Sequence, residues 1–137
     1  MARPNRRFEN ESPIVVLPSV ARAAAETFTS AVFDGEGSKA RGMLFYAKCT
    51  AGGGSDVDVD FLVEKWNPTT MVWDSVLAST ADVMDGEGET VVMIVHPDVS
   101  ATANESAAAN LAPKWRFSAI HDHAETITYS VLGFPLV

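Results

Sequence analysis

Cysteine is almost absent from this sequence, and its scarcity limits the chemistry available to the chain. Cys49 is the only cysteine among 137 residues, so no disulfide can form within the chain. The residues around it are typical of an apolar strand. We therefore expect Cys49 to be a small core residue and not a reactive thiol.

Long hydrophobic runs are also absent. No apolar stretch approaches the ~20 residues that a membrane helix needs, so we expect no membrane partner. Residues 1–7 contain three arginines, but no apolar segment follows them. The sequence therefore predicts no secretory signal.

Basic residues are few. Ten Lys and Arg stand against 18 Asp and Glu, which gives a net charge of −8. A compact acidic body repels phosphate backbones, so we expect no nucleic-acid partner. Four of the ten basic residues lie in the first 22 positions: Arg3, Arg6, Arg7 and Arg22. This distribution predicts a basic arm that docks on another molecule, and the alternative is a solvated, frayed terminus.

Catalytic signatures are missing as well. The glycine run at residues 52–55 lacks the Lys-Ser/Thr of a phosphate-binding loop. No serine sits in a Gly-x-Ser-x-Gly elbow, and no context supports a Cys–His pair. The sequence thus predicts no enzymatic activity and no cofactor.

Candidate metal ligands are present but incomplete. His121 and His123, with Glu125 nearby, have the residue types of a metal site, but no third ligand is assured. Asp-Gly-Glu-Gly occurs at residues 34–37 and 85–88 without a full calcium-binding series. We expect a solvated turn and two acidic loops, and no metal. Asp56, Asp58 and Asp60 would share one strand face, as a solvated face or as a docking surface for a basic partner.

The sequence is rich in alternating apolar residues. In residues 56–77, Val57, Val59, Phe61 and Val63 fall on one parity and mostly polar residues on the other, with Leu62 and Trp66 as apolar exceptions, and after Asn67-Pro68 the alternation resumes. This pattern predicts a β-hairpin at the centre of an antiparallel sheet. Similar runs predict strands over residues 40–50, 90–96, 114–121 and 126–131, with an extended segment over residues 19–33. In residues 40–50 both faces look apolar, which is typical of a central strand.

These runs predict an all-β fold, an antiparallel β-sandwich of seven or eight strands, Ig-like or jelly-roll-like. We assign residues 1–18 to an extended N-terminal arm and residues 19–137 to the sandwich. Within the arm, the proline-bracketed run at residues 14–17 is compatible with an edge strand or a docking segment. Residues 98–113 suggest a crossover between sheets, with a short helix near residues 107–109.

Several stretches together resemble a known family. They are Ala40-Arg41-Gly42, the hairpin at residues 57–77, Val95-His96-Pro97, the Ala- and Asn-rich residues 101–112, Leu111 to Phe117, and residues 121–131. In order and spacing they are similar to the small β-sandwich head proteins of tailed bacteriophages, the decoration or cement class. The resemblance covers most of residues 40–131.

This resemblance implies a non-enzymatic protein on the outer surface of a virion capsid, made in the cytoplasm of the host bacterium. The implied partners are the major capsid protein and further copies of the chain, in a homotrimer or another symmetric assembly. As contact residues we select the arginines and apolar side chains of the arm: Arg3, Arg6, Arg7, Phe8, Ile14, Val15, Val16 and Leu17. The alternatives are a low-copy neck or tail protein, and a carbohydrate-binding module that uses Trp66, Trp73 and Trp115.

Overall fold

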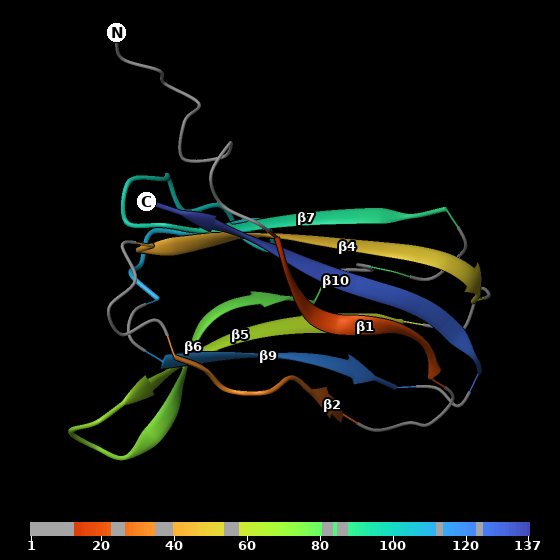
Figure 1. Ribbon diagram of the computed structural model, residues 1–137, viewed down its shortest axis with the longest axis horizontal. Coiled ribbons are helices and arrows are strands. Elements are labelled where there is room, and N and C mark those ends of the chain that lie inside the picture. Colours follow the sequence, from red (N-terminus) through yellow and green to blue (C-terminus); the bar gives the residue numbers. More distant parts are fainter. Residues whose placement is uncertain are drawn as a thin grey trace, which may run out of the picture.

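Two β-sheets are stacked face to face in this protein (Figure 1). The computed structural model describes residues 13–22, 27–34, 40–53, 58–80, 84, 88–111, 114–122 and 125–137. The described residues form strands, turns and irregular segments, with no helix among them. No helix long and apolar enough to cross a membrane is found in them either. The predicted antiparallel β-sandwich is confirmed.

The first sheet, called sheet A, has the strand order β1-β10-β4-β7-β8. Its pairs are antiparallel except for the β7–β8 pair, which is parallel. The strands are β1 (Ile14–Arg22), β10 (Ile127–Leu136), β4 (Gly42–Gly52), β7 (Thr90–Val95) and β8 (Ser106–Ala107). The central position predicted for the strand at residues 40–50 is confirmed, because β4 lies between β10 and β7.

The second sheet, called sheet B, has the order β2-β9-β5-β6, and β3 pairs with β9 as well. The strands are β2 (Thr27–Thr29), β3 (Phe33–Asp34), β9 (Lys114–His121), β5 (Val59–Asn67) and β6 (Val72–Ser79). The described residues form ten strands, more than the predicted seven or eight. The difference arises from β3 and β8, which are two residues long, and from β2, which is three residues long.

The core lies between the two sheets and is built mainly from the inward-facing residues of the longer strands. Phe45, Phe61, Phe117 and Tyr129 are almost completely buried. The ring of Phe117 lies 5.1 Å from that of Phe45 on sheet A and 5.5 Å from that of Phe61 on sheet B. Aromatic contacts of this kind join the two sheets. Cys49 is buried in the same core, as expected.

The predicted hairpin is confirmed as β5 and β6, and Asn67 organises its turn. Asn67 Oδ1 accepts hydrogen bonds from the backbone N–H groups of Thr69 at 3.0 Å and Thr70 at 3.2 Å. The turn ends at Met71, whose φ of 58° is unusual for a bulky residue. The expected central position holds for β5 only, because β6 forms the edge of sheet B.

The predicted boundary between arm and sandwich at residue 18 is wrong. β1 begins at Ile14, and its side chains at Val16 and Leu17 are buried in the core. The physical reason is that residues 14–17 pair with the apolar end of β10. β1 is an edge strand, as the flanking prolines suggested.

The apolar C-terminal residues belong to the interior of sheet A, because β10 extends to Leu136 and lies between β1 and β4. The helix expected near residues 107–109 does not form. Ala107 instead belongs to β8, and its carbonyl accepts a hydrogen bond from the backbone N–H of His96.

Candidate functional site

The side of sheet A that points away from the core is apolar across four strands. Antiparallel pairing places Val15, Leu132, Tyr46 and Val92 in one row from β1 to β7. A second row joins Phe134, Leu44 and Ile94 across β10, β4 and β7. We call these seven residues the outer face. Side chains directly opposite one another on one side of a sheet form a continuous surface.

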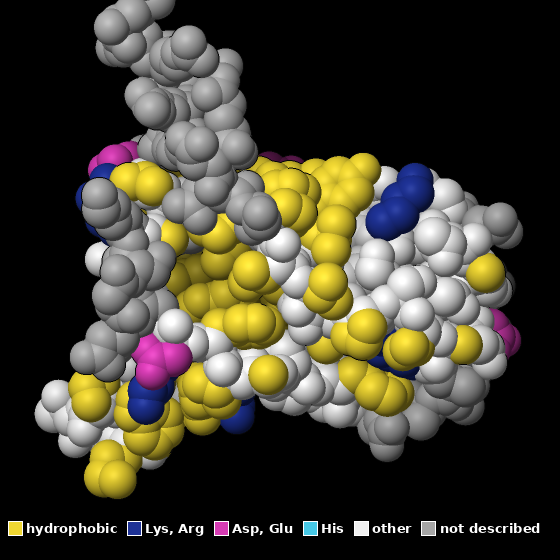
Figure 2. Space-filling view, in the orientation of Figure 1, with side chains coloured by type: hydrophobic (Ala, Val, Ile, Leu, Met, Phe, Trp, Pro, Cys, Tyr) yellow, Lys and Arg dark blue, Asp and Glu magenta, His cyan; other side chains and the backbone are white. Residues whose placement is uncertain are grey.

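The outer face is open to solvent in the described part of the chain. Val15 is 59% exposed, Tyr46 37% and Val92 44%, while the other four residues are partly buried. Figure 2 shows hydrophobic side chains gathered along the upper side of the molecule, over the strands of sheet A. Contiguous apolar surface of this kind is characteristic of a site that another macromolecule covers.

Polar and charged residues border the outer face at both ends of the strands. At one end Ser130, Lys48 and Thr90 form the next row, and Lys48 Nζ lies 3.3 Å from Thr90 Oγ1. At the other end Arg41 Nη2 lies 3.2 Å from Asp98 Oδ2. An apolar centre with a polar margin is the usual composition of a protein–protein interface.

Among the predicted contact residues that the structure describes, Val15 alone lies on this face. Val15 points outward, whereas Val16 and Leu17 are buried. Ile14 packs inward against the core, close to Gly133. The docking role predicted for Ile14, Val16 and Leu17 is therefore corrected to a role in the core. Arg3, Arg6, Arg7 and Phe8 lie outside the described residues.

The signal for the outer face was present in the sequence. Apolar residues occupy both parities of β4: Met43 and Phe45 face inward, and Leu44 and Tyr46 face outward. Such a strand is either buried on both sides or exposes an interaction surface. A strand buried on both sides and a strand with an exposed interaction surface have the same residue pattern. They can be told apart only once it is known which side of the strand packs against the second sheet.

Of the candidate metal ligands His121 and His123, the structure describes His121. His121 points into the sandwich, is 3% exposed, and its Nε2 lies 2.5 Å from the hydroxyl of Tyr129. The expectation of a solvated turn is wrong for this residue. His123 lies outside the described residues, and no group of three potential ligands is found among those the structure describes.

Burial changes the ionisation of both partners in this contact. The pKa of His121 is lowered by desolvation, and the positive charge of Arg22 lowers it further, while Asp122 raises it. Desolvation also raises the pKa of Tyr129 well above its usual range. The phenol is therefore neutral over the physiological range, and the imidazole is held in its neutral form.

This arrangement predicts a pH dependence of stability. Above about pH 6.5 both the folded and the unfolded His121 are neutral. Below that pH the imidazole binds a proton more readily in the unfolded state than in the folded state. The free energy of unfolding therefore falls as the pH falls. Urea unfolding at pH 7.5, 6.5 and 5.5 should show a steeper loss in the wild type than in His121→Gln. If the free energy of unfolding falls with pH equally in the wild type and in His121→Gln, burial of His121 is not the cause of the pH dependence.

The three tryptophans do not form a flat stacking surface. Trp115 is 4% exposed and stacks on Phe33 in the core. Trp66 and Trp73 meet edge to face near the hairpin turn, with an angle of 63° between their planes. The guanidinium of Arg116 lies 4.3 Å from the centre of the Trp73 ring. This geometry does not favour the carbohydrate-binding alternative.

The acidic candidates are only partly described. Asp58 and Asp60 are half-buried at the start of β5, and Asp56 lies outside the described residues. Of the two Asp-Gly-Glu-Gly segments, the structure describes only Asp34 and Gly88. Gly88 has a φ of 87°, a value that favours glycine at this turn.

Comparisons with known proteins give structural similarity but no match to a family model or a curated protein. The chain is similar to the crystal structure of the Yersinia pseudotuberculosis-derived mitogen (YPM), with 14% sequence identity and a TM-score of 0.48. The similarity covers 90% of this chain and 86% of the mitogen chain. We draw no conclusion about function from it.

Proposed function

We propose that this protein is a non-enzymatic structural component of a bacteriophage virion, which binds the outer surface of the capsid and stabilises the shell. The observation that supports this most directly is the outer face of sheet A. Its seven apolar residues lie on a rigid, hydrogen-bonded sheet and not on a loop. The resemblance to decoration proteins leads to the same proposal.

The rigidity of the outer face matters for the energetics of docking. Burial of apolar surface contributes about 25 cal/mol per Å². A preformed sheet loses little conformational entropy on binding, so more of that gain remains as affinity. A capsid shell repeats the same junction many times, so a moderate contact at each junction stabilises the whole particle.

The charge of the protein fits a protein partner. With a net charge of −8, the body is disfavoured as a ligand for nucleic acid. The outer face itself carries no charged side chain. We propose the major capsid protein as the partner, with the chain arranged on it as a homotrimer or another symmetric assembly.

A low-copy position at the neck or tail of the virion is the alternative, and stoichiometry separates the two. Quantitative mass spectrometry of purified virions would give the ratio of this protein to the major capsid protein. A ratio near one, or a simple lattice fraction of it, supports the decoration role. A handful of copies per particle would move the protein to the neck or tail, and its absence would contradict the proposal.

Charges placed on the outer face are expected to abolish docking. In the double variant Tyr46→Asp/Val92→Asp, two carboxylates would be desolvated at the apolar centre, so we expect the affinity for capsids to fall ~100-fold or more. Co-sedimentation with capsids that lack the protein measures this.

The matched control is Ala31→Asp/Val32→Asp, which adds the same charge at exposed positions between β2 and β3. We expect it to bind capsids like the wild type. Equal affinity of the two double variants for capsids would show that the outer face does not bind the capsid.

A further inference from the structure

A buried histidine connects the two sheets at one end of the sandwich. His121 ends β9 in sheet B, and its Nε2 lies 2.5 Å from the hydroxyl of Tyr129 on β10 in sheet A. Its other ring nitrogen, Nδ1, is buried and has no hydrogen-bond partner among the residues that the structure describes. A buried polar atom without a partner costs free energy, and contact with water recovers that cost. The Nδ1 atom of His121 therefore favours an opening that admits water.

The side chains around the ring oppose a positive charge on it. Phe28 of β2 meets the ring edge to face, with 4.9 Å between the ring centroids, and Val59 of β5 is the strand partner of His121. The guanidinium of Arg22 on β1 lies 5.8 Å from the centroid of the same Phe28 ring and 4.4 Å from that of the neutral Tyr129. An imidazolium here would be a second buried cation in the cluster that holds Arg22.

Two carboxylates adjoin this cluster. Asp122 follows His121 in the chain and is exposed, and its charge raises the pKa of His121. Asp58 is half-buried and precedes Val59, the strand partner of His121. Burial and the charge of Arg22 outweigh Asp122, because the pKa of His121 is lowered on balance. The closed protein therefore resists protonation of this imidazole.

The strands that carry this cluster differ in how they are held. β9 lies between β2 and β5, and β10 lies between β1 and β4, so His121 and Tyr129 are on interior strands. Arg22 and Phe28 belong to β1 and β2, which end their sheets within the described part of the chain and follow one another in the sequence. An edge strand has one hydrogen-bonded neighbour and opens at a lower free energy than an interior strand. β1 and β2 are therefore the elements that can move away from His121.

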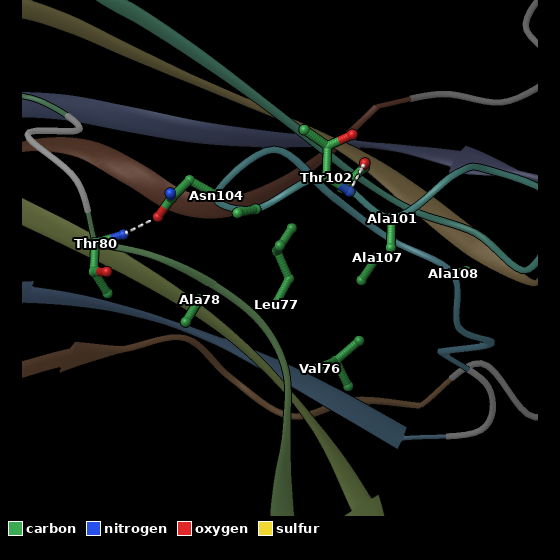
Figure 3. A pocket seen from close by; sticks show the side chains of 11 residues that line it. Val76, Leu77, Ala78, Thr80, Ala101, Thr102, Asn104, Ala107 and Ala108 are labelled. Atoms are coloured by element: carbon green, nitrogen blue, oxygen red, sulfur yellow. Dashed lines mark hydrogen bonds between the residues drawn. The ribbon is translucent and has the colours of Figure 1, made fainter.

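The opposite edge of the sandwich is tied between the sheets. Residues 101–108, which include β8 of sheet A, face β6 of sheet B across an open groove of about 600 Å³. At one side of this groove the backbone N–H of Thr80 donates to Asn104 Oδ1 at 2.9 Å (Figure 3). Neither group in this hydrogen bond titrates, so we expect this edge to stay closed in acid.

Two anchors limit the part of β1 and β2 that can open. β1 shifts its register against β10 directly after Leu17, which is buried, and the next residue is a proline without an N–H. Beyond β2, the N–H of Ser30 donates to the carbonyl of Phe117 at 2.8 Å, and Ser30 Oγ accepts from the N–H of Phe117 at 2.9 Å. Residues 18–22 and 27–29 lie between these anchors, and we call them the edge segment.

We propose that protonation of His121 opens this end of the sandwich by releasing the edge segment from β10 and β9. Release takes Arg22 away from the imidazolium and admits water to it. A proton that binds the open state more tightly than the closed state shifts the equilibrium toward opening as the pH falls. The opening exposes the edge of β10 at residues 127–129, which can then pair with another strand. Val15 lies outside the edge segment, so the inference does not depend on capsid binding by the outer face.

Hydrogen–deuterium exchange of the full-length chain, measured at about pH 7.5 and about pH 5, tests the inference. Division by the intrinsic exchange rate at each pH gives the opening equilibrium constant of each segment. An opening that exposes His121 binds one proton, so its constant can rise up to about tenfold for each pH unit below the usual pKa of histidine. For the edge segment we expect a rise of about tenfold between the two pH values. At the lower pH its constant should also exceed that of residues 59–63 in β5 by about tenfold or more.

Two results in the wild type alone would overturn the inference. Fraying that leaves His121 buried binds no proton, so one such result is an opening constant of the edge segment that does not change with pH. The other is an opening constant at the lower pH that equals that of β5, because the edge segment would then open only when the whole domain unfolds.

Two single variants assign the proton to its residue. His121→Gln should remove the rise in the opening constant of the edge segment. His96→Gln is the matched control, because His96 is also buried but hydrogen-bonds at both ring nitrogens and lies outside the cluster. It should keep the rise. A rise that persists in His121→Gln, or that is lost in His96→Gln, would contradict the assignment. No capsid is used in these experiments, so the proposed function keeps its own test.

Discussion

Replacing Gly42 with alanine is expected to lower the free energy of unfolding by more than about 3 kcal/mol. A Cβ at this position would lie 2.0 Å from the carbonyl oxygen of Val95 and 2.9 Å from the Cα of His96. These are backbone atoms, so no rotamer change relieves the clash. β4 and β7 would have to separate where Met43 pairs with Val95, at the end of their ladder in sheet A. Urea unfolding followed by circular dichroism measures the loss.

Gly88 provides the matched control for this prediction. Its φ of +87° strains any other residue, but nothing lies within 4 Å of a Cβ built there. Gly88→Ala should therefore cost only the strain of the left-handed conformation, about 1–2 kcal/mol. If Gly42→Ala lowers the free energy of unfolding no more than Gly88→Ala does, then β7 moves aside without destabilising the fold.

The parts of the fold that could be predicted are those with a local signal. Val59, Phe61 and Val63 share one side of the strand, with Asp60 and the half-buried Leu62 on the other, and burying that side fixes β5 whatever the rest of the chain does. Asn67-Pro68 marks the turn through local chemistry. The β-sandwich could be predicted because such alternating segments and turns recur along the chain.

The parts that could not be predicted depend on contacts between distant segments. The sequence of β4 does not tell which of its two apolar faces meets sheet B, so the outer face was not recognised. Ile14, Val16 and Leu17 were assigned to an arm because their place in the core depends on pairing with β10, more than a hundred residues later. His121 was placed at the end of its strand but expected to be solvated, because its partner, Tyr129, lies across a segment whose path is not encoded in periodicity.

Arg22 is the residue whose role departs most from the sequence prediction. It was grouped with the basic residues of the N-terminal region, yet it is only 4% exposed. Its guanidinium donates to the carbonyls of Pro18 at 2.8 Å, Val20 at 3.1 Å and Tyr129 at 2.9 Å. Its Cζ also lies 4.4 Å from the centre of the Tyr129 ring. Burial lowers the pKa of Arg22, but an arginine remains protonated.

The position of these carbonyls explains why an arginine is needed. The register of β1 against β10 shifts twice, between Val15 and Leu17 and again between Leu17 and Val20. Such irregularities interrupt the regular ladder. The planar guanidinium, with five N–H donors, reaches the carbonyls of Pro18 and Val20 on β1 and of Tyr129 on β10 at once. Arg22 therefore holds the irregular half of β1 on sheet A.

Replacing Arg22 with methionine is expected to lower the free energy of unfolding by about 3 kcal/mol, because three carbonyls lose their donor while the aliphatic volume is largely kept. Arg22→Lys should recover only part of this, since one ammonium group cannot reproduce the fork. Arg41→Met is the control: its ion pair with Asp98 is half-exposed, so we expect a loss within about 1 kcal/mol. Urea unfolding at constant pH compares the three variants. Equal losses for Arg22→Met and Arg41→Met would mean that water replaces the guanidinium at these carbonyls and that β1 does not depend on it.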